Sequence, residues 1–493
     1  MLQMPAALKE NLSTSMRKFV FATIAICLTS CAPRIGEVTE GGEDAPIYPD
    51  YRDVTVPDNI APLNFSFTGE GTSALKINGS KIVRPRKGLY KFSRREWRTL
   101  MDSDSARFTL LVRKGKSWNA CKDFSIHVSH DKIDPYISYR LIPPGYQGWE
   151  KMGIYQRNLE NYRETPIYEN TNGGSNCCNC HTYCNGNPNT LLFHVRASFG
   201  GTMVVEGSNI EKLNTKTDST ISALVYPFWH PDGEKVAFSV NKTFQQFFNH
   251  GEDRIEVYDD ASDVVVYNLR THRIAWSPLT KSEENFETYP CFSPDGKWLY
   301  FCSAEAVDNV THNIEKPHYG IKRIAFDAAT MSFGDTLETV FDAPALGKSC
   351  SYPRVSPDGR YLCFTLHKYG NFAIWHKDAD LWMVDLQSGR SWPLEELNSD
   401  CSDSSHNWSG SGRWLGFNSR RDDGLYTRTY ISHIDENGVA SKPFMLPQKD
   451  PVKYYKRLLM SYNLPQFTSG KVAVNRRRLV NVMRNSSGTD IGC

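Results

Sequence analysis

The chain has 493 residues, of which 40% are hydrophobic and 23% charged, and 57 Lys and Arg against 55 Asp and Glu leave a formal net charge of +2. This balance excludes intrinsic disorder and gives no electrostatic basis for binding nucleic acid or an anionic membrane surface. Aromatic residues make up 12% of the chain, and 34 Gly and 26 Pro are spread along it. This composition favours many short strands and turns, so an all-β fold is expected.

The first thirty residues have the pattern of an export signal. Arg17 and Lys18 precede an apolar run over 19–28 that is too short to span a bilayer. The run ends in Leu28-Thr-Ser-Cys31, which resembles the lipobox of bacterial lipoproteins. The resemblance implies a lipid anchor at Cys31 that holds the mature protein at the outer membrane of a bacterial cell envelope; an ordinary cleaved signal is the alternative. We therefore expect a signal peptide over 1–30 and a flexible tether over 31–46.

Apolar and polar residues alternate in several segments between residues 47 and 145. These segments, 75–83, 107–113, 123–128 and 136–142, are bounded by turn residues. The pattern predicts strands of a small β-sandwich-like domain. Residues 146–170 show no such alternation, so 146–186 is expected to be a linker into the next domain.

Four of the 13 cysteines lie within eight residues, and the run Cys177-Cys-Asn-Cys180-His181 contains Cys-x-x-Cys-His. This is the signature of c-type haem attachment, in which two thiols bond to the macrocycle and the following His lies under the iron. The pattern predicts covalent haem c on Cys177 and Cys180, with His181 as axial ligand. The resemblance to cytochromes c implies that the haem is attached outside the cytoplasm.

Other chemistries compete for the same cysteines. Zinc bound by Cys177, Cys180, His181 and Cys184 is one alternative, and disulfides are a second. An iron–sulfur cluster is a third. Cys178 and Cys184 are surplus to the haem pattern, and their pairing with each other would account for them.

The sixth ligand of the haem iron would decide whether the haem carries electrons or binds small molecules. His194, thirteen residues after His181, is the nearest downstream candidate, with Met203 and Met152 behind it. A His or Met ligand would give an electron carrier, whereas an open position would allow small-molecule binding or peroxidase-like turnover. Arg196 is a candidate to neutralise a haem propionate, and a plain surface charge is the alternative.

From residue 220 a Tyr-Pro-x-x-x-Pro-Asp-Gly pattern recurs, ending at Gly233, Gly296 and Gly359, with 63 residues between successive glycines. A degenerate copy follows at 407–412 and a fainter one at 462–470. Pro presets φ, Asp bonds the backbone beyond it and Gly takes the left-handed position, so each copy predicts a hairpin turn followed by a strand with one buried face. Such units cannot bury their faces alone and must stack into a closed ring.

The repeat resembles the Ser-Pro-Asp-Gly repeat of the TolB-like β-propeller family, whose members commonly have six blades. With 187–196 as the start of an irregular first blade, six blades are expected over 187–493. Independent hairpins with a shared turn are the alternative.

The leading hypothesis is an exported, lipid-anchored six-bladed propeller with covalent haem, which transfers electrons or senses redox state and binds proteins through the propeller. The second is a non-enzymatic TolB-like scaffold that binds protein or glycan, with a structural cysteine cluster. The third is a lyase or hydrolase with an axial metal, as in propeller enzymes resembling oligogalacturonate lyases. Its candidate ligands are His230, His367, His376, His406 and His433. The sequence contains no Gly-x-Ser-x-Gly, phosphate loop or dinucleotide fingerprint, and we predict no catalytic residue and no nucleic-acid partner.

Overall fold

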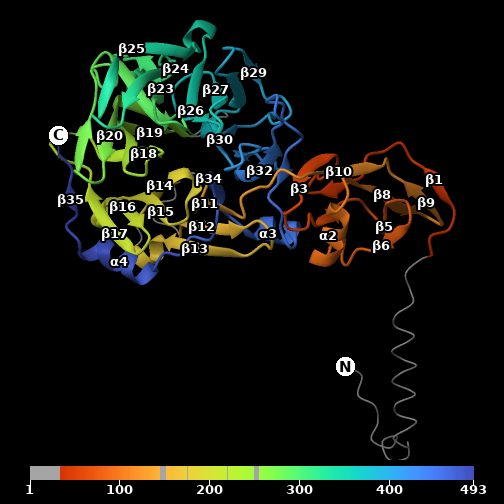
Figure 1. Cartoon of the computed structure of the whole chain (residues 1–493). Coiled ribbons are helices and arrows are strands. Elements are labelled where there is room, and N and C mark those ends of the chain that lie inside the picture. Colours follow the sequence, from red (N-terminus) through yellow and green to blue (C-terminus); the bar gives the residue numbers. More distant parts are fainter. Residues whose placement is uncertain (1–33, 145–150, 175, 219, 249–254, 493) are drawn as a thin grey trace, which may run out of the picture.

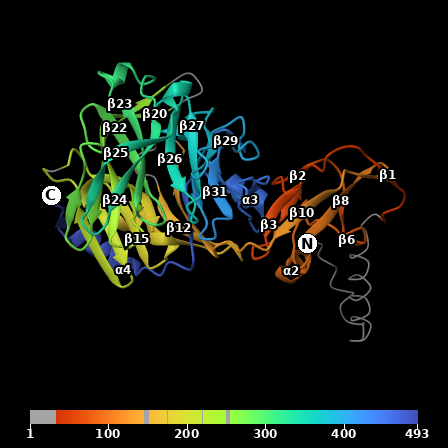
Figure 2. The ribbon, with the colours of Figure 1, turned by 45° about the horizontal axis from the view of Figure 1, so that its top comes forward.

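The computed structural model describes residues 34–144, 151–174, 176–218, 220–248 and 255–492. Within these residues the chain forms eight β-sheets and three α-helices. A smaller N-terminal part and a larger C-terminal part lie side by side in both ribbon views (Figures 1 and 2). The predicted signal peptide and the predicted lipidation site at Cys31 lie outside the described residues. No helix within the described ranges is long and apolar enough to cross a membrane.

The N-terminal part contains two sheets, and most of their buried hydrophobic side chains belong to one hydrophobic cluster, while Ala74, Leu111 and Trp118 form a second, smaller one. The seven-stranded sheet consists of β1 (Val38–Glu40), β3 (Val54–Pro57), β5 (Ser73–Ile77), β6 (Lys81–Val83), β8 (Ser105–Lys114), β9 (Ser117–Ala120) and β10 (Phe124–Ser129). The three-stranded sheet consists of β2 (Ile47–Tyr48), β4 (Phe65–Phe67) and β7 (Leu89–Tyr90). Strands dominate this part, as expected, and its sandwich-like architecture stays a prediction.

The helix α2 (Arg94–Met101) accompanies these sheets. It begins at a capping box, in which Ser93 Oγ accepts the backbone N–H of Glu96 and the Glu96 carboxylate accepts the backbone N–H of Ser93. This satisfies two backbone donors that a helix start otherwise leaves unpaired. The helix buries Trp97 and Met101 in the same cluster.

The other six sheets have four or five strands each. The first contains β11 (Tyr136–Ile142), β12 (Gly153–Asn158), β13 (Glu164–Glu169) and β34 (Ser461–Thr468), and the second contains β14 (Cys178–Tyr183), β15 (Thr190–Val195), β16 (Gly201–Glu206), β17 (Asn209–Asn214) and β35 (Thr489–Asp490). The third contains β18 (Leu224–Trp229), β19 (Lys235–Phe247), β20 (Ile255–Asn268) and β21 (Arg273–Ala275), and the fourth contains β22 (Asn285–Phe292), β23 (Trp298–Glu305), β24 (Gly320–Asp327) and β25 (Ser332–Phe341). The fifth contains β26 (Ser349–Val355), β27 (Tyr361–His367), β28 (Asp380–Asp385) and β29 (Ser391–Pro393), and the sixth contains β30 (Asp403–Trp408), β31 (Trp414–Ser419), β32 (Arg428–His433) and β33 (Phe444–Met445).

The inner strands of these sheets form a closed ring. β14 contacts β18, and the series continues through β22, β26 and β30 to β34, which contacts β14. β34 comes from near the C-terminus, yet it pairs with β11, so one sheet combines both ends of the ring-forming segment. Helices α3 (Pro451–Arg457) and α4 (Arg476–Asn485) flank β34 in the sequence. Sheets packed radially and closed by strands from both ends make a β-propeller, which confirms the predicted class of fold.

The domain boundaries expected from the sequence are wrong at one point. β11 was expected in the sandwich-like domain and 146–186 was expected to be a linker, but β11 pairs with β34, and β12 and β13 extend the same propeller sheet. The faint repeat copy at 462–470 overlaps β34. The partner of β11 lies more than 300 residues later in the chain, so no local pattern could reveal the pairing.

The second strand of each repeat is buried more completely than expected. β27 and β31 are buried at every position, although the alternation predicted a single buried face. The physical reason is that each sheet lies between two neighbouring sheets, so both faces of its central strands are covered.

The repeat turns form with the predicted chemistry. Gly296 has a φ of 73° and Gly359 a φ of 75°, a region that glycine adopts without strain. Asp295 accepts the backbone N–H of Lys297 at 3.1 Å, and Ser293 Oγ accepts that of Trp298 at 3.0 Å. Each turn is thus held by its own side chains, which fixes the strand that follows.

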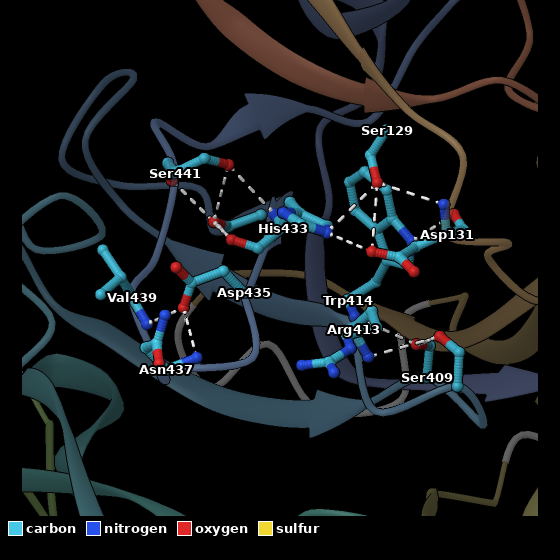
Figure 3. Close-up of polar contacts among 12 residues, drawn as sticks. Ser129, Asp131, Ser409, Arg413, Trp414, His433, Asp435, Asn437, Val439 and Ser441 are labelled. Atoms are coloured by element: carbon cyan, nitrogen blue, oxygen red, sulfur yellow. Dashed lines mark hydrogen bonds and ion pairs between the residues drawn. The ribbon is translucent and has the colours of Figure 1, made fainter.

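The N-terminal part is joined to the propeller by a set of polar contacts around His433 (Figure 3). His433 Nε2 lies 2.7 Å from Asp131 Oδ2 and 3.2 Å from Ser129 Oγ, at the end of β10. The hydrogen bond from His433 lowers the pKa of Asp131 below its ordinary value. The indole Nε1 of Trp414 donates to the Asp131 carbonyl at 2.9 Å. Core residues of both parts belong to one hydrophobic cluster, so the two parts are packed together rather than tethered.

A buried carboxyl between neighbouring sheets makes the stability of the fold depend on pH. Glu287 on β22 is 2% exposed, and burial, assisted by the nearby Asp263, raises its pKa from 4.5 to about 8. The folded protein therefore retains a proton that the unfolded chain releases between these values, so stability falls as the pH rises through this window.

We expect Glu287→Gln to remove this loss of stability at high pH, because the amide side chain does not ionise. The variant should be more stable than the parent by about 2 to 4 kcal/mol at pH 8 and nearly equal to it at pH 4.5, as measured by urea unfolding. If the variant and the parent differed in stability by the same amount at pH 4.5 and at pH 8, the raised pKa of Glu287 would be contradicted.

Candidate functional site

A cavity of about 670 Å³ opens at the end of the ring where the inner strands begin. We call it the axial cavity. Its lining includes Cys180 on β14, Tyr226 on β18, Tyr352 on β26 and Leu464 on β34. The site is therefore assembled from four separate sheets, each of which supplies a residue of its innermost strand.

These four residues share one backbone position. Each inner strand contains a non-glycine residue with positive φ at a register shift of the sheet: Cys180, Tyr226, Tyr289, Tyr352, Ser405 and Leu464. Extra residues of this kind bend a strand and redirect its side chains. The tyrosine rings meet one another, with centroids 4.5 Å apart for Tyr226 and Tyr289 and 4.3 Å apart for Tyr289 and Tyr352.

The shared backbone position gives the cysteine motif a structural role that the sequence did not suggest. Cys180 occupies in its sheet the position that a repeat tyrosine occupies in the next three, and Gly186 follows with a φ of 66°. The Cys-x-x-Cys-His segment is thus a degenerate copy of the repeat. It lies on a strand with a bulge and not on a helical turn.

The structure places both cysteines predicted to attach haem at the axial cavity and leaves the predicted axial ligand outside its lining. Cys177 and Cys180 both line the axial cavity, whereas His181 is outside its lining. His181 is 1% exposed, packs against the Tyr183 ring and has its pKa lowered to about 3, chiefly by burial. Both cysteines therefore border the cavity, whereas His181 does not suit the role of axial ligand to a group held there.

Of the other three candidate haem ligands, two line the axial cavity and one does not. His194 and Met152 line the axial cavity together with Arg196, whereas Met203 is fully buried in a hydrophobic cluster. His194 lies opposite Asn179 in the pairing of β14 with β15, and its ring contacts Thr202 at 3.2 Å. Burial, assisted by Arg196, lowers the pKa of His194 to about 3, so the ring is neutral.

The described cysteines do not form the clusters that were considered as alternatives. All ten of them have free thiols, and Cys178 and Cys184 belong to different hydrophobic clusters, so they do not pair with each other. No three His, Cys, Asp or Glu side chains in the part of the chain that the structure describes are grouped so that they could hold a metal ion. The alternative zinc site at Cys177, Cys180, His181 and Cys184 is therefore not assembled among the described residues. Of the two histidines predicted as metal ligands, His194 lines the axial cavity and His181 does not.

The five histidines considered for an axial metal also fail to converge. His376 Nε2 lies 2.8 Å from a Glu256 carboxylate oxygen, and its ring lies 5.1 Å from the ring of His367. The rings of the other three contact separate partners: His230 contacts the Gly296 carbonyl, His406 the Cys363 carbonyl and His433 the Asp131 carboxylate. The axial-metal prediction has no support in this arrangement.

All charged side chains of the described residues that line the axial cavity are positive. Arg140, Arg196 and Lys216 line the axial cavity, and no Asp or Glu does so among the described residues. Both arginines act to lower the pKa of the Cys180 thiol, although burial raises it overall. The guanidinium groups therefore lie close enough to the thiol to influence it electrostatically.

Most of these lining residues were not predicted as a site. The tyrosines are visible in the sequence as the first residue of each repeat, but the turn chemistry of Pro, Asp and Gly gives them no role. Equivalent positions in successive repeats are the signal that could have placed them on one axis. Arg140 lies on β11, whose place in the propeller depends on the distant β34, so no local pattern could place it here.

The chain shows distant similarity to solved structures of other proteins. No protein-family model and no curated protein sequence matches the chain. Among solved structures, a prolyl endopeptidase is similar at 11% identity and a TM-score of 0.32 over 63% of this chain, which spans 43% of that protein. The β-propeller domain of the Trilobed protease from Pyrococcus furiosus gives 10% identity and a TM-score of 0.31 over 70% of this chain and 95% of that domain. A DUF4784 family protein from Bacteroides caccae gives 8% identity and a TM-score of 0.29 over 70% of this chain and 94% of that protein.

Proposed function

We propose that this chain is an exported, six-bladed, TolB-like propeller lipoprotein that binds a small polar molecule in the axial cavity. One observation carries the proposal: residues from four inner strands enclose a single cavity on the axis. Its volume of about 670 Å³ falls in the range of about 300 to 1,000 Å³ that is typical of small-molecule sites. The six radial sheets and the Ser-Pro-Asp-Gly turns support the blade number and the family. The lipobox supports an anchor at Cys31.

Filling the cavity tests this proposal. Ala223 lines the cavity and is half-buried, so Ala223→Trp would occupy part of its volume. Ala329 is exposed in the turn between β24 and β25 and provides a matched control, Ala329→Trp. Thermal unfolding would be followed against a panel of sugars, sugar acids, amino acids and nucleotides.

We expect some members of the panel to raise the unfolding temperature of the parent and of Ala329→Trp, and to leave that of Ala223→Trp unchanged, because ligand binding stabilises only a protein that can bind. The proposal fails if no member of the panel acts on the parent, or if Ala223→Trp responds as the parent does.

A second candidate is covalent haem attachment. Its supporting observation is that Cys177 and Cys180 line one cavity with His194 and Met152. A haem would supply redox chemistry there, and the two thiols would hold it. After expression with a cytochrome maturation system, a haem-linked peroxidase stain on a denaturing gel should be positive for the parent and negative for Cys180→Ser; a colourless parent would exclude this candidate. Protein binding by the propeller stays a prediction.

A further inference from the structure

We infer that the ligand of the axial cavity is an acidic saccharide, a hydroxyl-rich molecule that carries at least one carboxylate or phosphate group. The inference rests on the proposed function, because it names the class of ligand for the same cavity.

The first argument is uncompensated positive charge. Arg140, Arg196 and Lys216 line the cavity, and among the described residues none of the three forms an ion pair with a carboxylate. Arg140 is half-buried, and its only hydrogen bond in the described part of the chain is donated by Nη1 to the Cys178 carbonyl at 3.2 Å, so its Nε lacks a partner. A guanidinium group binds carboxylates and phosphates through paired, charge-assisted hydrogen bonds. An anionic ligand would supply the missing counter-charge.

The second argument is the position of these cations. Arg196 and Lys216 are exposed, whereas Arg140 is half-buried on β11. The exposed pair would attract an anion from solution, and Arg140 would meet it in a less polar setting, where a charged hydrogen bond is stronger. The histidine of the cavity adds no charge, since His194 is neutral with its pKa lowered to about 3.

The third argument concerns the rest of the wall. Side-chain amides line the cavity from four strands, and they belong to Asn179, Asn214, Asn241, Gln245 and Asn463. An amide carries both donors and an acceptor, which matches the hydroxyl groups of a sugar. The Nδ2 of Asn241 already donates to Asp259 and Thr288, and that of Asn214 to Asp490, so Asn179, Gln245 and Asn463 are the amides that best suit a ligand. Aromatic rings of Tyr226, Tyr352 and Phe372 also line the cavity and provide apolar faces for a sugar ring. Cations, amides and aromatic rings together fit a saccharide with an acidic group.

The test uses D-glucuronate, D-glucose 6-phosphate and D-glucose as probes, with calorimetric titration of the intact protein. The variants are Arg140→Gln, Arg196→Gln and Lys216→Gln. The control is Lys297→Gln, because Lys297 is an exposed cation that does not line the cavity. Unfolding temperatures of all variants would be measured in parallel, and the two exposed positions keep the test valid if Arg140→Gln folds poorly.

We expect at least one acidic probe to bind at least tenfold more tightly than D-glucose, and its affinity to fall at least tenfold in Arg196→Gln, less in Lys216→Gln and not in Lys297→Gln. Preference for D-glucuronate would identify a carboxylate sugar, and preference for D-glucose 6-phosphate a phosphorylated one. Equal affinity for D-glucose, or no effect of the cavity substitutions, would overturn the inference while leaving the proposed function intact. If neither these probes nor the wider panel bind, the proposed function itself fails.

Discussion

A chain that ends at Leu459 should lose the cooperative unfolding transition of the propeller. The truncation removes β34, which pairs along its length with β11 and buries Tyr462 and Phe467. Without it, β11 becomes an unpaired inner edge and β14 loses its neighbour on one side, so the ring opens. We expect a flat near-ultraviolet dichroism melt and rapid proteolysis.

The matched control for this truncation ends at Ser486. It removes β35, a two-residue strand that pairs with β17 at the outer edge of its sheet, together with the buried Ile491. This chain should keep a cooperative melt with a modestly lower midpoint. If the chain that ends at Leu459 melts like the parent, closure by β34 is not what holds the ring together.

The second large effect is expected at the junction between the two parts of the molecule. Trp414 on β31 is fully buried, contacts the His433 ring with centroids 4.9 Å apart and donates to the Asp131 carbonyl. Trp414→Ala would leave a large void in a cluster shared by both parts. Substitutions of this kind cost about 3 to 5 kcal/mol, and equilibrium urea unfolding would measure the loss.

Trp414→Phe separates packing from the hydrogen bond at this position. It retains most of the aromatic surface and removes only the indole N–H, so a smaller loss of about 1 kcal/mol is expected. If Trp414→Phe were as costly as Trp414→Ala, the hydrogen bond to Asp131, and not burial, would dominate the junction.

The class of fold could be predicted because its evidence is local. The turns ending at Gly296 and Gly359 carry their own Pro, Asp and Gly, and their 63-residue spacing marks stacked units. The pairing of β34 with β11 could not be predicted, because it joins segments at opposite ends of the propeller. The expected boundary at residue 145 was wrong for this reason.

The candidate site was predicted in part. Cys177, Cys180 and His194 were singled out by residue type and line one cavity. His181 was assigned by a motif whose geometry presumes a helical turn, but the segment is a bulged strand that directs Cys180 to the axis and leaves His181 outside the cavity lining. A spacing pattern specifies a site only when the backbone conformation beneath it is also known.

The most direct test of ligand binding in the axial cavity is the alkylation rate of Cys177, which lines the cavity and is half-buried. Its modification by iodoacetamide would be followed by peptide mass with and without a saturating acidic sugar, and the half-buried Cys401 outside the cavity would serve as reference. Ligand should slow the reaction of Cys177 several-fold and leave that of Cys401 unchanged. If a bound sugar leaves the rate at Cys177 unaltered, the ligand binds elsewhere and the account is contradicted.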